Sequence, residues 1–205
     1  MSEHPPSDFV AALRALGDGL EGLGLPWMII GGVAVIASGV ARYTADIDAT
    51  LSAPEESLER VLAALRERGI EARIESAAAF ARDHHVLLLR HGSSGVPIDV
   101  SLALLPFETE ALRASRAIEY AGVTVPVAAV DDLIVYKLVA SRPRDIDDAA
   151  RLLALHGPSL DVARIRRTVA EFAEALEDRE RPAVLERLLR EAGLAPGDGA
   201  TGPAR

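Results

Sequence analysis

The chain of 205 residues has no cysteine, which excludes a disulfide framework, a thiolate zinc site and a cysteine nucleophile. Aromatic residues make up only 4% of it, so a hydrophobic core has to be built from Ala, Leu, Val and Ile. No apolar run reaches the roughly 18 residues that a membrane-spanning helix requires. The N-terminal sequence also lacks the basic region and apolar stretch of a secretory signal. These absences predict a cytoplasmic protein that has no membrane partner.

The chain has fewer basic than acidic residues: 22 Lys and Arg against 31 Asp and Glu give a formal net charge of −9 at pH 7. This balance argues against broad, charge-driven binding to nucleic acid, although a local basic groove is compatible with it. We therefore expect no DNA partner. Apolar residues nevertheless make up 49% of the chain, which is enough for the core of one large domain or two small ones.

Sequence patterns divide the chain into two parts. Residues 8–127 alternate helical periodicity with short apolar strands, which predicts an α/β (α+β) sheet domain. Residues 128–194 show helical periodicity almost throughout, which predicts a helical domain. The two ends, residues 1–7 and 195–205, are rich in proline or glycine and are typical of disordered segments.

Asp46 and Asp48 are separated by one residue. They follow a glycine pair, Gly31 and Gly32, that lies at the end of an apolar run. On a strand predicted over residues 45–51, the two carboxylates share one face. Carboxylates placed so close favour a hard cation such as Mg²⁺ between them. The glycines would let the backbone approach a phosphate ahead of a helix N-terminus. Together these features predict a site for a metal-bound nucleoside triphosphate, with two exposed aspartates and a simple tight turn as the alternative.

Three further residues are candidates for the same site. Asp99 lies on a strand predicted over residues 96–103, opposite its apolar neighbours, although the wet face of an antiparallel sheet explains this equally well. Lys137 shares the apolar face of a helix predicted over residues 130–140, so it either extends to water or binds phosphate in a cleft. Asp145 is either a site residue or the N-terminal cap of the next helix.

Two longer stretches carry a family likeness. They are Gly31-Gly32-Val33-Ala34 running into Arg42-Tyr43-Thr44-Ala45-Asp46-Ile47-Asp48, and Lys137-Leu138-Val139-Ala140-Ser141-Arg142-Pro143-Arg144-Asp145-Ile146-Asp147-Asp148. With a strand aspartate between them, they resemble the polymerase-β-like nucleotidyltransferase superfamily and look most like its AbiEii-type toxin nucleotidyltransferases. The resemblance runs from about Leu20 to Leu153. It implies the nucleotidyltransferase sheet domain followed by a helical C-terminal domain.

The resemblance also implies roles for individual residues. The implied catalytic residues are Asp46, Asp48, Asp99, Lys137 and Asp145. The implied nucleotide-binding residues are Gly31, Gly32, Arg42, Thr44 and Lys137. The implied ligands of Mg²⁺ or Mn²⁺ are Asp46, Asp48 and Asp99. The chemistry is an in-line attack on the α-phosphate of an NTP that releases pyrophosphate.

The resemblance predicts transfer of a nucleoside monophosphate from the NTP to RNA, with tRNA as the expected acceptor, or to protein. It further predicts a toxin that a cognate antitoxin restrains. Two alternatives stay open: a nucleotidyltransferase for a small cationic molecule such as an aminoglycoside, which suits an acidic protein, and a nucleotide-binding protein without catalysis. Gly32 departs from the wider superfamily, in which many members carry serine at this position.

Overall fold

The computed structural model describes residues 5–194. The chain divides into two compact units with the boundary between Ala129 and Val130; unit 1 is the N-terminal part and unit 2 the C-terminal part. Unit 1 combines helices with a sheet, so the mixed α/β class predicted from the sequence is confirmed. The disorder predicted for residues 1–4 and 195–205 lies outside the described residues, whereas Ser7, which we placed in the disordered N-terminus, opens a helix.

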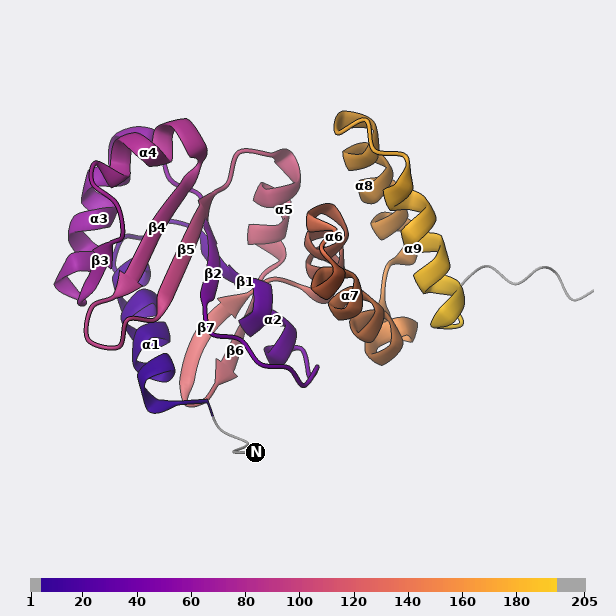
Figure 1. The fold of residues 1–205 in the computed structure, drawn as a ribbon, viewed down its shortest axis with the longest axis horizontal. Coiled ribbons are helices and arrows are strands. Elements are labelled where there is room, and N and C mark those ends of the chain that lie inside the picture. The colour runs from indigo at the N-terminus through magenta and orange to yellow at the C-terminus, as the bar shows by residue number, and fades with distance from the viewer. Residues whose placement is uncertain (1–4, 195–205) are drawn as a thin grey trace, which may run out of the picture. The chain divides into compact units, whose positions relative to one another are not determined.

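The described part of unit 1 is one mixed sheet with helices around it. The strands are β1 Trp27–Ile30, β2 Ile47–Leu51, β3 Ile70–Ala72, β4 Val86–His91, β5 Pro97–Leu102, β6 Arg116–Tyr120 and β7 Val123–Val127. The helices are α1 Ser7–Glu21, α2 Gly31–Ala37, α3 Leu58–Glu67, α4 Ala77–His84 and α5 Pro106–Ala114, with a 3₁₀ turn at Glu55–Ser57. The strand order is β3-β4-β5-β2-β1-β7-β6, which leaves β3 and β6 at opposite edges (Figure 1).

Near Asp48 and Asp99 the sheet has a dry face and an open face, because side chains alternate along each strand. Farther along the strands, Met28 and Thr50 are fully buried although they lie on the same side as Asp48. One row of paired residues has no exposed surface and consists of Ile29, Ala49, Val100 and Leu87. The neighbouring row points the other way, is only half-buried, and consists of Ile30, Asp48, Asp99 and Leu88. Carboxylates can therefore stand on the open face without entering the core.

Helix α1 covers the dry face. Its fully buried leucines, Leu13, Leu16 and Leu20, recur at helical spacing and so form one apolar stripe. A Cβ added at Gly17 would lie 3.8 Å from the Trp27 ring, which shows how closely the helix approaches β1. Burying each leucine contributes about 1.5–3 kcal/mol, so this layer fixes the strands that carry the carboxylates.

Two boundaries near the predicted site differ from the sequence prediction. The helix predicted over residues 33–40 begins at Gly31, so the glycine pair forms its first turn instead of preceding it. The strand predicted over residues 45–51 begins at Ile47, so Asp46 lies in the bend before β2. Because β1 turns into α2 at this point, Asp46 has no β1 residue beside it with which to pair.

Unit 2, as far as it is described, is a set of packed helices. They are α6 Val130–Ala140, α7 Pro143–His156, α8 Val162–Ala175 and α9 Glu180–Glu191, with a 3₁₀ turn at Gly157–Ser159. Helix α6 contacts α7, α8 and α9, and α9 also contacts α7 and α8. The core contains Leu133, Leu138, Leu152, Leu153, Val169 and Leu189. Among residues 5–194, none of the helices is long and apolar enough to cross a membrane.

Candidate active site

Asp48 and Asp99 lie side by side on the open face of the sheet. Strands β2 and β5 run parallel, and their register pairs these two residues. Residues paired across neighbouring strands point to the same face, so the two carboxylates project together. The preceding pair, Ile47 and Ile98, is fully buried on the dry face. The fold thus brings together two aspartates that are far apart in the sequence.

Gly31 lies directly against Asp48. Its φ of +61° falls in the left-handed region that side chains disfavour, and an added Cβ would lie 2.6 Å from the Asp48 Cγ. At Gly32, an added Cβ would lie 2.8 Å from the Thr44 Cβ and 3.2 Å from the Arg42 Nη2. Gly31 therefore requires glycine, whereas a side chain at Gly32 would force Thr44 to shift.

An extended segment before β2 carries the other residues predicted for unit 1. Exposure alternates over residues 41–45, with Arg42 and Thr44 half-buried and their neighbours exposed. The Thr44 hydroxyl donates a hydrogen bond of 2.8 Å to Asp46 Oδ1, and Arg42 Nε donates one of 3.3 Å to the Tyr43 carbonyl. Thr44 therefore orients the first carboxylate of the pair.

Arg73 is a site residue that the sequence did not reveal. It follows β3, and its Nη2 donates a hydrogen bond to Asp99 Oδ1 and forms an ion pair with it. The two residues are 26 positions apart, and no motif or spacing connects them. Only the order of β3, β4 and β5 in the sheet brings them together.

Burial on the sheet raises the pKa of the Asp99 carboxyl above its ordinary value. The positive charge of Arg73 opposes this rise, whereas the negative charge of Asp46 adds to it. The influence of Asp46 places the carboxylates of Asp46 and Asp99 within electrostatic reach of each other. The site is therefore a group of mutually repelling carboxylates, with Arg73 paired to Asp99 and Arg42 beside Gly32.

The residues predicted in unit 2 form a buried cluster of their own. Lys137 Nζ lies 3.0 Å from Asp145 Oδ1 and 3.0 Å from Asp148 Oδ2, and the three side chains are 8%, 10% and 3% exposed. Asp145 is not the helix cap considered above, because α7 begins at Pro143 after Arg142 as N-cap. The second carboxylate of this cluster is Asp148, which follows Asp145 by one turn of α7.

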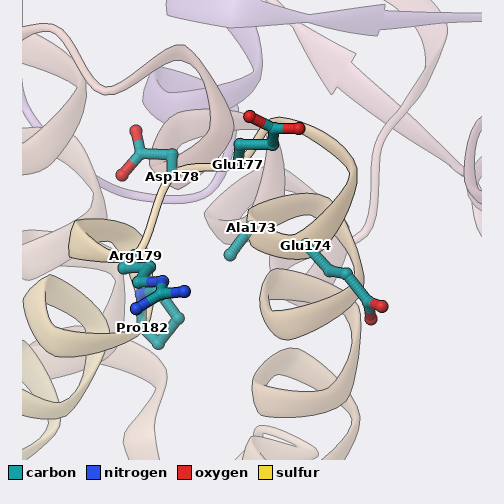
Figure 2. A pocket seen from close by; sticks show the side chains of 6 residues that line it. All are labelled: Ala173, Glu174, Glu177, Asp178, Arg179 and Pro182. Carbon is teal, nitrogen blue, oxygen red and sulfur yellow. The ribbon is translucent and has the colours of Figure 1, made fainter.

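A surface hollow of about 660 Å³ lies where α8 gives way to α9. Figure 2 shows the residues that line it: Ala173, Glu174, Glu177, Asp178, Arg179 and Pro182. None of them belongs to the predicted site. The Asp178 carboxylate forms an ion pair with Arg181. Because the hollow shares no lining residue with the two clusters described above, it is separate from them.

Comparison with protein families gives one match. The model of the family described as nucleotidyl transferase AbiEii toxin, of a type IV toxin–antitoxin system, matches residues 14–198. This stretch contains both the carboxylates of unit 1 and the lysine cluster of unit 2. No curated protein matches the chain.

Comparison with solved structures shows the same fold in an antibiotic-resistance factor, a lincosamide antibiotic adenylyltransferase and a Helicobacter pylori protein. The antibiotic-resistance factor ANT(2″)-Ia matches with a TM-score of 0.56 and 21% identity, over 87% of this chain and 95% of that one. The lincosamide antibiotic adenylyltransferase LnuA, bound to lincomycin, matches with a TM-score of 0.51 and 14% identity, over 75% and 99%. JHP933 from Helicobacter pylori matches with a TM-score of 0.52 and 14% identity, over 94% and 93%.

At these identities the solved structures show the nucleotidyltransferase fold alone. The family match is of another kind, because it spans most of the chain and both groups of charged residues. The chain belongs to the AbiEii toxin family of nucleotidyl transferases.

Proposed function

We propose that this protein transfers a nucleoside monophosphate from an NTP to RNA, with tRNA as the expected acceptor, and that a cognate antitoxin restrains it. The observation that best supports the proposal is the pairing of Asp48 with Asp99 in register, with Gly31 packed against Asp48. Membership of a toxin family supports the toxin role. Protein is the other macromolecular acceptor that an assay has to include.

The proposed enzyme depends on Mg²⁺ or Mn²⁺, and the donors of the site fit such an ion. Asp46, Asp48 and Asp99 offer only carboxylate oxygens, the donors that hard divalent cations prefer. Gly31 leaves the Asp48 carboxylate uncovered where any side chain would collide with it. Within residues 5–194, no three His, Cys, Asp or Glu side chains already form a closed metal site, so the carboxylates would have to gather around the ion.

Each residue then has a defined task. When bound, the divalent cation supplies Lewis acidity and neutralises charge on the phosphates. Asp46 and Asp48 hold it from the segment before β2 and from β2 itself. Asp99, whose pKa is raised, accepts the proton of the attacking hydroxyl on a carboxylate oxygen. Gly31 and Gly32 admit phosphate oxygens to the backbone of α2.

In the same proposal, Lys137 binds the triphosphate and Asp145 positions it. An ammonium group has three N–H donors, and two of them point to the carboxylates of Asp145 and Asp148. We assign the third donor to a phosphate oxygen. Anchoring by two carboxylates fixes the direction of the ammonium, which favours one phosphate geometry over others.

A small cationic acceptor is the second candidate. This chain shares its fold with ANT(2″)-Ia, for which a complex with adenylyl-2″-tobramycin is known. The net charge of −9 also suits a positively charged molecule. Adenylylation of an aminoglycoside without labelling of RNA would favour this candidate.

The test is a labelling assay with purified protein, Mg²⁺ and each α-labelled NTP. Total RNA, tRNA, a protein extract and an aminoglycoside would be offered as separate acceptors. We expect label on RNA with the wild type and none with Asp48→Asn. The matched control is Asp18→Asn, because Asp18 is exposed on α1 and its substitution should leave transfer unchanged. Label that persists in Asp48→Asn would contradict the proposed site.

A further inference from the structure

Arg73 reaches Asp99 across an intervening strand. Its backbone N–H donates a hydrogen bond of 2.8 Å to the Leu88 carbonyl, which extends the pairing of β3 with β4 by one residue. Leu88 in turn pairs with Asp99. Arg73, Leu88 and Asp99 therefore stand in one row across three strands, and the arginine side chain crosses the open face to place its guanidinium on the carboxylate.

This ion pair occupies a ligand of the proposed cation. A guanidinium stays charged at every accessible pH, so it cannot be neutralised to make room for a metal. The side chains of Arg73 and Asp99 are 34% and 42% exposed, which leaves the pair open to exchange with ions and with a nucleotide. Asp99 forms its ion pair with Arg73, and no three carboxylates in the described part of the chain are arranged to hold a metal ion.

We propose that Arg73 is a positioning residue that competes with the divalent cation for Asp99, so that the cation binds weakly until a triphosphate draws the guanidinium away. Phosphate oxygens accept the same paired N–H donors as a carboxylate, and a triphosphate brings several of them close to the site. Arg73 then moves from carboxylate to phosphate and Asp99 is released to the metal. This inference rests on the proposed function, because it assigns an order of binding to the same site.

The inference predicts whether loss of the Arg73 charge strengthens or weakens binding of the cation. Removing the positive charge should tighten binding of the cation alone, because a unit charge about 6 Å from a divalent ion weakens its binding about tenfold at the dielectric of water. If Arg73 only supported the local structure, its loss would leave Asp99 less ordered and would weaken cation binding. The two roles therefore give opposite results in one measurement.

The experiment is a titration of the full-length protein with Mn²⁺ alone, followed by electron paramagnetic resonance of the free ion. We expect Arg73→Gln to lower the Kd for Mn²⁺ about tenfold, and Arg73→Lys, which keeps the charge, to stay near the wild type. Adding Asp99→Asn to Arg73→Gln should abolish the gain. Arg90→Gln is the matched control, because Arg90 forms an ion pair with Glu71 between β4 and β3, away from the proposed cation ligands.

An unchanged or higher Kd in Arg73→Gln would overturn the inference. Circular dichroism checks that each variant is folded, and Arg73→Met carries the same prediction if the glutamine variant is not. The measurement needs neither acceptor nor turnover. RNA labelling that depends on Asp48 without tighter Mn²⁺ binding in Arg73→Gln would reject the role of Arg73 alone, whereas absence of any labelling would reject the proposed function.

Discussion

Replacing Lys137 by methionine removes a cation that lies within hydrogen-bonding distance of both Asp145 and Asp148. The two carboxylates lie 3.0 Å from its ammonium and are 10% and 3% exposed. Methionine keeps the length and apolar contacts of the side chain but not its charge. The structure therefore predicts a large loss of stability, because two buried carboxylates would lose the ammonium that pairs with both of them.

The size of the loss follows from burial. Breaking a buried ion pair by removing one partner costs about 3–5 kcal/mol, and Arg142 Nε, 3.9 Å from Asp145 Oδ2 on a side chain that is 82% exposed, can recover only a small part of it. With a urea m-value of about 1–3 kcal/mol/M, a loss of 3 kcal/mol lowers the unfolding midpoint by roughly 1–3 M.

The assay uses the single tryptophan of the chain. Trp27 lies in β1, so its fluorescence reports unit 1, whereas far-ultraviolet circular dichroism also reports the helices of unit 2. We expect Lys137→Met to lower the urea midpoint seen by circular dichroism. Arg187→Met is the control, because Arg187 forms an exposed pair with Glu191 on α9 and should cost no more than about 0.5 kcal/mol.

A second substitution tests the cause. Adding Asp148→Asn to Lys137→Met removes one of the two negative charges that lost the ammonium, and it should restore part of the stability. A free energy of unfolding for Lys137→Met within about 0.5 kcal/mol of the wild type would refute the argument, because it would show that the carboxylates do not depend on the lysine.

Two further predictions concern the glycine pair and the surface of unit 2. Gly31→Ala should abolish transfer, because its Cβ would collide with Asp48. It should also destabilise the protein by more than the ~1–2 kcal/mol that a left-handed residue costs. Gly122→Ala is the control: Gly122 has φ +76° and open space around it, so its substitution should show the backbone cost alone in the same urea titration. Hydrogen bonds from Arg166 lower the pKa of Glu186, so this pair stabilises the fold above the ordinary glutamate pKa of 4.5 and loses that effect as the pH falls through the lowered value. Glu186→Gln should therefore cost at most about 1 kcal/mol at pH 7, and this cost should shrink as the pH falls through the lowered pKa, as measured by urea unfolding over a series of pH values.

Elements with strong local periodicity could be predicted from the sequence. The helix predicted over residues 130–140 has the bounds observed for α6, and the strand predicted over residues 96–103 corresponds to β5, Pro97–Leu102. Helix α4 was not predicted, because its buried residues are alanines, Ala77, Ala78 and Ala81, which mark no clear apolar face. Local pattern thus predicts elements whose own side chains carry the signal.

The pairing of charged groups could be predicted only in part. Asp48 and Asp99 were candidates because each stands among apolar strand residues, a local signal. Arg73 gave no such signal, since its partner depends on which strands are neighbours in the sheet. Asp148 lies one turn after Asp145, and only the packing of α6 against α7 shows that both face Lys137. Contacts of this kind are properties of the tertiary fold.

The most direct test of nucleotidyl transfer compares two positions of the label in one NTP. A nucleotidyltransferase moves the α-phosphate to the acceptor and releases the β- and γ-phosphates as pyrophosphate. We expect RNA to take up label from the α-labelled NTP and none from the γ-labelled NTP, and Asp48→Asn to abolish the uptake. Transfer of the γ-label, or α-label uptake that survives Asp48→Asn, would contradict the assignment of the reaction to the carboxylates of β2 and β5.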